Sequence, residues 1–204
     1  MTLDGKPKPT ELDPNGRPIP VDMHVVGFES RILDEALDLA KEALEDNDPD
    51  PLPAPLFGLL FPACSYALLL PEAPKRLRTE ALELLAAHAG EDEDGVPTLP
   101  NAASAVRLLL NTLSNATPDL VNLAKPILSD VSRYLQTNDD VLALVSGVES
   151  DYRAVRGASL SGLLSAPLDF SSMGEDAATE AIAKLFIARF DADEGNKQTA
   201  EEVW

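Results

Sequence analysis

One short pattern of residues returns at a nearly fixed interval along this chain of 204 residues. In each copy a basic residue is followed by a small residue and then by a large apolar residue, at steps of three and four. Such steps place side chains on one face of an α-helix, so each copy predicts one helix. The copies are Arg78, Ala81 and Leu85; Arg156, Ser159 and Leu163; and Lys197, Ala200 and Trp204.

The spacing of these copies predicts how the helices are assembled. The last two copies lie about 40 residues apart and the first two about twice that, which is the period of stacked helical pairs of the HEAT or armadillo kind. The same period places a further copy near residue 117, where Thr117 and Pro118 predict the start of a helix. We therefore expect an all-α fold, a HEAT/armadillo-like α-solenoid of about four to five helical repeats. An ordinary helical bundle with chance matches is the alternative.

Charge and cysteine usage narrow the classes of partner and compartment. The chain has 35 acidic and 16 basic residues, a formal charge of −19. This balance argues against a large nucleic-acid footprint and against docking on an anionic membrane, which both need clustered Lys and Arg. A single cysteine, Cys64, allows no intramolecular disulfide and fits a reducing compartment. The longest apolar stretch is too short to span a bilayer. We expect a cytoplasmic protein.

Capping residues, prolines and apolar periodicity predict where the elements lie. Residues 1–22 are rich in proline and charge, and we expect a disordered or extended lead-in there, followed by repeats over residues 23–204. Ser30 is expected to cap the first helix, and Leu56–Leu70, apolar nearly all round, to be a helix packed on both sides. Pro126 is expected to kink its helix or to separate a shorter one from it. Further helices are predicted over residues 75–89, 101–113, 117–135, 139–145, 151–165, 175–189 and 191–204.

The predicted helices carry apolar stripes that define the expected core. Trp204 places a large apolar side chain on the final residue, so we expect this chain to be part of a longer solenoid. Three aromatic residues near the end are interpreted as core between repeats, with exposed anchors for a partner as the alternative. These are Phe186, Phe190 and Trp204. The first predicted stripe consists of Ile32, Leu33, Ala36, Leu37, Ala40 and Leu44. Two later stripes are Leu120, Leu123, Ile127, Leu128 and Val131, and Ala178, Ile182, Leu185 and Phe186.

Few residues suggest chemistry. His24 and His88 are the only histidines, and no His or Cys pair has the spacing of metal ligands; His88 lies near a helix end, which favours a partial positive charge. Cys64 is expected to be an inert core thiol, Ser159 to lie in a seam of small residues, and the acidic loop Glu91–Asp94 to be solvated and at most a weak cation site. Phosphate-binding, dinucleotide-binding and nucleophile-elbow motifs are missing from the sequence. We expect no enzymatic activity and assign no catalytic, cofactor-binding or metal-binding residue.

The polar residues of the repeat are expected to form a ladder between helices. An acid at the turn, Asp151 or Asp191, can accept hydrogen bonds from the first N–H groups of the following helix. The base that follows it, Arg156 or Lys197, can reach the turn acid of its own repeat or of a neighbouring one. Such a ladder would be a structural device.

The residues from about 150 to 204 also resemble a known family. The matching runs are Asp151-Tyr152-Arg153, Val155-Arg156, Ala158-Ser159-Leu160, Ile187-Ala188-Arg189-Phe190-Asp191, Ala200-Glu201 and Trp204. Together they resemble a segment of the general-control translational activator, the very long HEAT-repeat protein that activates the kinase of translation initiation factor 2 alpha. Lys197 stands where Arg is expected, Val203 where Leu is expected, and the acidic turn carries Gly195. The N-terminal two thirds are similar only as helical repeats.

This resemblance implies an internal fragment of a non-catalytic scaffold. The family binds stalled or collided ribosomes, works with an ABC-type ATPase partner, and presents the protein kinase with its activating signal. Its kinase-binding element lies far downstream in the full protein, so no site residue is carried over to this chain. The acidity then favours contact with ribosomal proteins or the ATPase over direct contact with ribosomal RNA.

Two other function classes remain open. The first is a generic α-solenoid adaptor for transport or complex assembly, whose acidic loops grip a basic protein partner. The second is a small helical enzyme or ligand-binding bundle, which would need polar residues that converge on a pocket. The sequence suggests no residues for such a pocket.

Overall fold

A computed structural model describes residues 21–46, 51–70, 73–92, 94–167 and 169–204. The predicted lead-in over residues 1–22 lies outside this part of the chain except for its last two residues, which begin a helix. The described residues contain α-helices, one short 3-10 helix and no β-strand, and one isolated bridge joins Glu91 to Pro97. The all-α prediction is therefore confirmed.

The helical elements follow one another along the chain. They are α1 (Val21–Asp46), α2 (Ala54–Leu69), α3 (Lys75–Ala87), α4 (Ala102–Ser114), α5 (Pro118–Ser132), α6 (Asn138–Gly147), α7 (Arg153–Ser165), η1 (Phe170–Ser172), α8 (Glu175–Ala188) and α9 (Glu194–Val203). The longest connection, over residues 88–101, joins α3 to α4.

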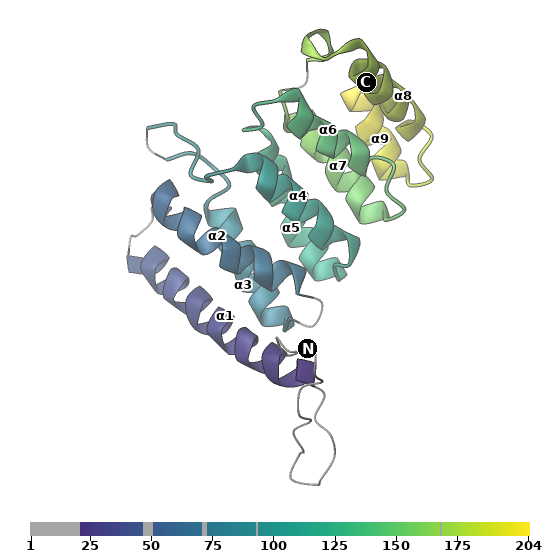
Figure 1. The fold of residues 1–204 in the computed structure, drawn as a ribbon. Coiled ribbons are helices and arrows are strands. Elements are labelled where there is room, and N and C mark those ends of the chain that lie inside the picture. Colours follow the sequence, from purple (N-terminus) through teal and green to yellow (C-terminus); the bar gives the residue numbers. More distant parts are fainter. Residues whose placement is uncertain (1–20, 47–50, 71–72, 93, 168) are drawn as a thin grey trace, which may run out of the picture.

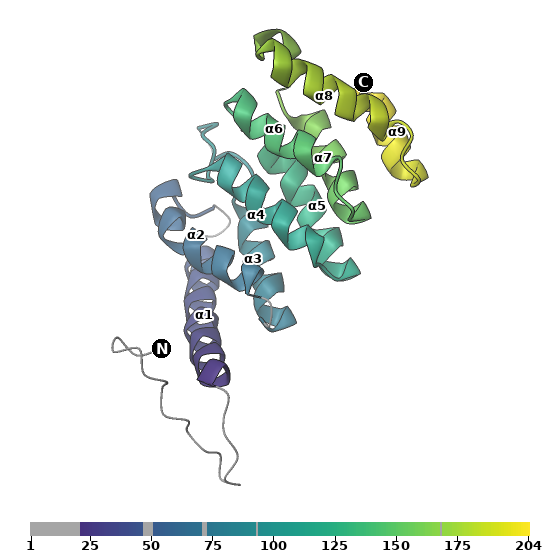
Figure 2. The same ribbon diagram turned by 45° about the vertical axis from the view of Figure 1, so that its right-hand side comes forward.

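The helices stack as pairs in two layers. Within each pair α2 packs on α3, α4 on α5, α6 on α7, and α8 on α9. The second helices form one continuous layer, in which α3, α5, α7 and α9 contact each other in that order. The first helices, α2, α4, α6 and α8, form the other layer, and α1 packs against both α2 and α3 (Figure 1). The second view shows the same progression from α1 to α9 (Figure 2), so the arrangement is compatible with an α-solenoid.

A single apolar core runs through this stack. It extends from Leu33 of α1 to Ala200 of α9, and the interior leucines Leu109, Leu128 and Leu160 are fully buried. Burying a leucine side chain is worth about 1.5–3 kcal/mol relative to leaving it exposed. Because every pair completes its core only on its neighbours, the stack is the unit that is stable.

A small-residue seam brings α7 close to its neighbours, as the sequence predicts. A Cβ atom on Gly162 would lie 2.8 Å from Leu128 Cδ2, 2.9 Å from Leu144 Cδ2 and 2.9 Å from Ser132 Oγ. These contacts are shorter than any that a real Cβ makes. Glycine is therefore required at this position if α5, α6 and α7 are to keep their separation.

Local capping signals place several helix starts correctly. Asn101 accepts a hydrogen bond from the Ser104 N–H at 2.9 Å and begins α4. Thr117 and Pro118 begin α5 as predicted. Pro126 lies inside α5, which continues through it as one helix, so no separate short helix precedes it. The packing of the apolar face on both sides of this proline outweighs the one backbone hydrogen bond that proline removes.

Other predicted helix starts are wrong. The first helix begins at Val21, nine residues before Ser30, because the intervening residues include no proline to stop it. Thr137 caps α6 instead of Asp139 or Asp140, and its side chain accepts a hydrogen bond from the Asp140 N–H at 3.3 Å. The helices α7 and α9 begin at Arg153 and Glu194, two and three residues after the turn acids Asp151 and Asp191 that were expected to start them. At α6, α7 and α9, several residues that can precede a helix are adjacent in the sequence, and local patterns do not decide which of them does so.

The predicted burial of α2 on both sides is also wrong. Leu56, Leu59, Tyr66 and Leu69 are exposed, because α2 packs on α1, α3 and α4 and no described helix covers its remaining face. Four other predicted core positions are exposed, again on faces that no described helix covers; they are Ile32, Leu123, Ile182 and Phe186. None of the helices in the described ranges combines the length and the apolar character needed to cross a bilayer.

Candidate functional site

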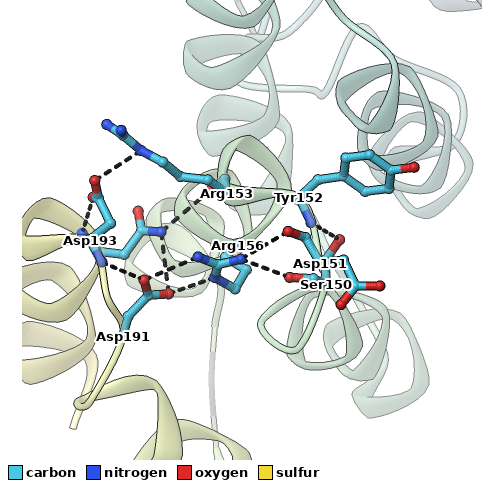
Figure 3. A network of polar contacts seen from close by, with 8 residues as sticks. Ser150, Asp151, Tyr152, Arg153, Arg156, Asp191 and Asp193 are labelled. Carbon is cyan, nitrogen blue, oxygen red and sulfur yellow. Dashed lines mark hydrogen bonds and ion pairs between the residues drawn. The ribbon is translucent and has the colours of Figure 1, made fainter.

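The main polar junction of the described chain joins the last two helical pairs (Figure 3). Arg156 lies in the first turn of α7, and its Nε and Nη2 donate to the two carboxylate oxygens of Asp191 at 2.6 and 3.1 Å. Its Nη1 also donates to the carbonyl oxygens of Ser150 and Asp151 at 3.0 and 3.2 Å. One guanidinium therefore ties the turn before α7 to the turn before α9. The predicted reach from the base to the acid of a neighbouring repeat is confirmed here.

The acid of this junction is held in its charged form. Asp191 also accepts the N–H of Asp193 at 2.8 Å, and only 4% of its side chain is exposed. The predicted capping by the turn acid is wrong, because Asp193 caps α9 by accepting the Asn196 N–H at 3.0 Å and α7 has no side-chain cap. The hydrogen bond from Arg156 holds the pKa of Asp191 below its usual range and raises the pKa of Arg156. The pair is therefore ionised at neutral pH.

A buried amide completes the junction. Asn196 of α9 is buried, and its Nδ2 donates to the Arg153 carbonyl and to Asp191 Oδ2, both at 3.4 Å. A Cβ on Gly157 would lie 2.5 Å from Asn196 Oδ1, so glycine in α7 makes room for the amide. On the solvent side, Arg153 Nε donates to Asp193 Oδ2 at 2.9 Å. Asn196 was not among the predicted residues, although its spacing of three from the cap residue Asp193 signals the start of α9.

The junction forms one wall of a groove on the layer of second helices. This groove lies between α5, α7 and α9 and has a volume of about 840 Å³. Its walls offer amide groups and charges of both signs, which can hydrogen-bond a polypeptide chain. Pockets for small molecules are instead largely apolar and enclosed, so the groove suits protein docking better than catalysis. The polar lining residues are Asn122, Lys125, Arg153, Asp193, Asn196, Gln198, Thr199 and Glu202.

His88 is a structural residue. Its ring is fully buried and stacks on the Phe57 ring with centroids 3.8 Å apart. Nε2 accepts the Leu52 N–H at 3.0 Å, which leaves Nδ1 to donate to the Leu84 carbonyl at 2.7 Å. Burial lowers the pKa of His88, so the ring is neutral. The expected partial positive charge is wrong, because desolvation of the ring outweighs the favourable field of the helix end.

The structure also places Cys64 and the acidic loop that the sequence singled out. Cys64 is buried, and burial raises its pKa to about 12, which agrees with an inert core thiol. The carboxylate of Asp92 in the acidic loop accepts the N–H groups of Asp94 and Val96 at 3.0 and 2.8 Å. Gly95 has a φ of 75° and turns this exposed loop. The side chain of His24 lies outside the described residues.

A group of three carboxylates between α1 and α3 is paired with two basic side chains. One oxygen or more from each of Asp34, Asp38 and Glu80 lies within 4.8 Å of the others. Arg76 pairs with all three, at 2.9 Å to Glu80 and 3.7 Å to Asp38, and Lys41 lies 3.7 Å from Glu80. This group links α1 and α3 through ion pairs.

The aromatic residues near the end of the chain form an exposed cluster. The Phe186 ring lies 5.5 Å from the Phe190 ring and 5.8 Å from the Trp204 ring, and Arg189 stacks on Trp204 at 5.3 Å. The interpretation of these rings as core between repeats is wrong for this structure, because no described helix covers this face of α8 and α9. Their exposure fits the alternative interpretation, in which the three aromatic side chains are anchors for a partner.

Comparisons with known proteins give no assignment. No protein-family model matches the chain, and no curated protein matches it. The function has therefore to be argued from the junction, the groove and the exposed surfaces of the chain itself.

Proposed function

We propose that this chain is a non-catalytic scaffold segment of a ribosome-associated translational activator, built from about four to five HEAT-like repeats. The parent protein would be of the general-control family, which helps switch on the initiation factor 2 alpha kinase during amino-acid starvation or ribosome stalling. The observation that carries this proposal is the Arg156–Asp191 pair. It joins successive helical pairs through the two residues that the repeat pattern assigns to the turn acid and the following base.

Equivalent contacts in other pairs support the repeat assignment. Arg78 of α3 donates to the carbonyl of Leu70, at the end of the preceding helix, at 2.7 Å. Arg156 makes the corresponding bonds to the turn before α7. The small residues of the three copies, Ala81, Ser159 and Ala200, are all fully buried. The third base, Lys197, pairs within its own helix with Glu194 at 3.4 Å, so the ladder is weaker at this copy.

The resemblance and the junction coincide in space. The resembling runs supply Asp151, Arg153 and Arg156 from one pair and Asp191 from the next, which are the residues drawn together in Figure 3. The groove beside them has a polar, mixed-charge surface that suits a protein ligand. With a net charge of −19, contact through ribosomal proteins or the ATPase partner is favoured over contact with ribosomal RNA.

Co-sedimentation with purified ribosomes tests this proposal. The chain and its full-length parent are each incubated with collided and with single ribosomes, and the pelleted fraction is compared. Enrichment of the parent on collided ribosomes is expected, and binding by the chain itself would place a contact in these repeats. If neither pellets with either kind of ribosome, the proposal is wrong. Tight, salt-sensitive binding to purified ribosomal RNA would contradict the protein-mediated contact.

Two charge-reversal variants locate the contact. Lys125→Glu changes the exposed rim of the groove, and Arg133→Glu makes the same charge change at the end of the same helix, away from the groove. If the groove is the contact, Lys125→Glu reduces pelleting and Arg133→Glu does not. Circular dichroism and thermal melting confirm that both variants remain folded.

The acidic surface also favours the second candidate, a generic α-solenoid adaptor that binds a basic protein partner. On this reading neither the chain nor its parent pellets with ribosomes, whereas the chain binds an immobilised basic protein such as lysozyme and is released by salt. The two candidates therefore differ in the same pair of assays.

A further inference from the structure

The outer face of α2 carries an unbroken apolar stripe. No residue of this 16-residue helix is charged, and four of its large side chains are exposed at helical spacing. The exposed fractions are 44% for Leu56, 77% for Leu59, 43% for Tyr66 and 52% for Leu69. Single exposed leucines are ordinary on a protein surface, but an aligned series on one face marks an interaction site.

The stripe continues onto α1. Ile32 and Leu39 of α1 are 51% and 65% exposed, and their separation of seven residues places them on one side of the helix. The side of α1 that faces α3 is fixed by Asp34, Asp38 and Lys41, which form ion pairs with α3. By helical spacing, Ile32 and Leu39 lie on the flank of α1 away from these ion pairs. The helix α2 packs beside α1 (Figure 1). We call the combined surface the outer strip; it consists of Ile32, Leu39, Leu56, Leu59, Tyr66 and Leu69.

The rim of the outer strip is acidic on one side and uncharged on the other. Glu35 and Glu42 are exposed and lie within one helical turn of Leu39 on α1. Among the side chains of α1 that the structure describes, the one base is Lys41, and it is paired on the α3 side. The base of α4, Arg107, is paired with a carboxylate of α6. Within the described surface, the strip therefore offers carboxylates and no free cation to an incoming molecule.

We propose that the outer strip docks an amphipathic helix of a partner protein. The apolar stripe of that helix lies on α2, and Lys or Arg side chains on its flank face Glu35 and Glu42. Helix-on-helix packing suits the strip, because its large side chains recur at the spacing of helix ridges. A second copy of this chain would set like charges against each other, and so would an anionic membrane. The inference goes beyond the proposed function and does not depend on it.

A pair of model peptides tests the chemistry of the partner. Both peptides match α2 in length, at 16 residues, and carry leucine at helical spacing; one has lysine and the other glutamate at the remaining positions. Binding to the full chain is measured by fluorescence anisotropy at about 0.15 M salt. The lysine peptide is expected to bind at least about tenfold more tightly than the glutamate peptide.

Matched variants locate the binding site. Leu59→Gln combined with Tyr66→Gln is expected to weaken the lysine peptide at least about tenfold, because these are central apolar contacts. Glu35→Gln combined with Glu42→Gln is expected to weaken it about threefold to tenfold. Two controls leave binding unchanged: Ile187→Gln, a comparably exposed apolar residue on α8, and Glu175→Gln with Asp176→Asn, which removes two carboxylate charges at the start of α8. Because all these side chains are exposed, each variant is expected to fold as judged by circular dichroism.

Several outcomes would overturn the proposal. The lysine peptide could bind the strip variant as tightly as the unchanged chain, or the glutamate peptide could bind equally well. Sedimentation could show a dimer that Leu59→Gln with Tyr66→Gln converts to a monomer, which would make a second copy the occupant. Strip-dependent binding to phosphatidylcholine vesicles would identify a lipid surface instead.

Discussion

Arg156 and Asp191 are 35 positions apart in the chain, and their side chains share two hydrogen bonds of 2.6 and 3.1 Å. Only 21% of the Arg156 side chain and 4% of the Asp191 side chain are exposed, so water screens this ion pair weakly. The same guanidinium bonds the carbonyls of the turn before α7. The pair is therefore a clamp between the last two helical pairs, and it is expected to contribute to the stability of the stack.

Removing the charge of Asp191 tests that contribution. Asp191→Asn keeps the shape of the side chain but leaves the buried face of the guanidinium without its counter-charge. We expect the free energy of unfolding to fall by about 2 kcal/mol, the size of a charge-assisted hydrogen bond. Urea unfolding followed by circular dichroism measures this change, and the midpoint should fall while the slope stays constant.

The neighbouring pair Arg153–Asp193 supplies the control. Arg153 Nε is 2.9 Å from Asp193, but 76% of the Arg153 side chain is exposed. Arg153→Gln is therefore expected to cost less than about 1 kcal/mol. If Asp191→Asn costs no more than Arg153→Gln, the clamp is not a stabilising feature. A double-mutant cycle with Arg156→Gln separates the pair from the other bonds of Arg156.

His88 predicts a dependence of stability on pH. The folded protein holds His88 neutral with a lowered pKa, whereas the unfolded chain protonates its histidines near pH 6.5. Below that pH the unfolded state binds more protons, so the free energy of unfolding decreases as the pH falls from 6.5 toward the pKa of the folded state. Protonation would also place a hydrogen on Nε2, and this hydrogen would face the Leu52 N–H from which Nε2 now accepts a hydrogen bond.

Comparison with His88→Gln isolates this effect. His24 and the carboxylates titrate in both proteins, so the difference between their stability curves reports His88. We expect the difference in the free energy of unfolding between the two proteins to shrink as the pH is lowered from about 7 to 5. The protein with His88 loses stability over this range because its unfolded state takes up a proton on His88, and the variant has no such group. Parallel curves over this range would show that His88 does not couple to folding.

Two glycines in helices are expected to respond in opposite ways to alanine. Gly162→Ala places a methyl group within 3.0 Å of Leu128, Leu144 and Ser132, so the seam must open. We expect a net loss of about 1–3 kcal/mol from this overpacking, although alanine favours a helix by about 1 kcal/mol. Gly58→Ala meets nothing nearer than 3.8 Å, and should stabilise the chain by about 0.5–1 kcal/mol. Thermal melting of both variants measures the difference, and equal shifts would disprove the close approach at Gly162.

Cys64 should be protected from alkylation while the protein is folded. Burial raises its pKa from the ordinary value of 9.0 to about 12, which lowers the thiolate fraction near pH 8 by roughly a thousandfold. Iodoacetamide, followed by mass spectrometry, should therefore label Cys64 at the rate of unfolding and not at the rate of a free thiol. Rapid labelling without denaturant would indicate that α2 opens readily.

Much of the helical framework was predictable because its signals are local. Asn101 starts α4 by accepting an N–H one turn away, and Pro118 starts α5 through its fixed φ at the first helical position. The face that holds Leu77, Ala81 and Leu85 is set by helical spacing. The repeat period also predicted which helix is the second member of each pair. The start of α1 was missed, since nothing local separates Ser30 from the residues before it.

The sequence by itself determined which segments are helical and which residues recur from pair to pair, because backbone hydrogen bonds and side-chain spacing act within one or two turns. Only the tertiary structure decided that Arg156 bonds the acid of the next pair, that His88 is neutral and that one face of α2 is exposed. The physical reason is common to all three. Partner choice, desolvation and burial depend on which groups from distant parts of the chain lie within a few ångströms, and no local pattern specifies those groups.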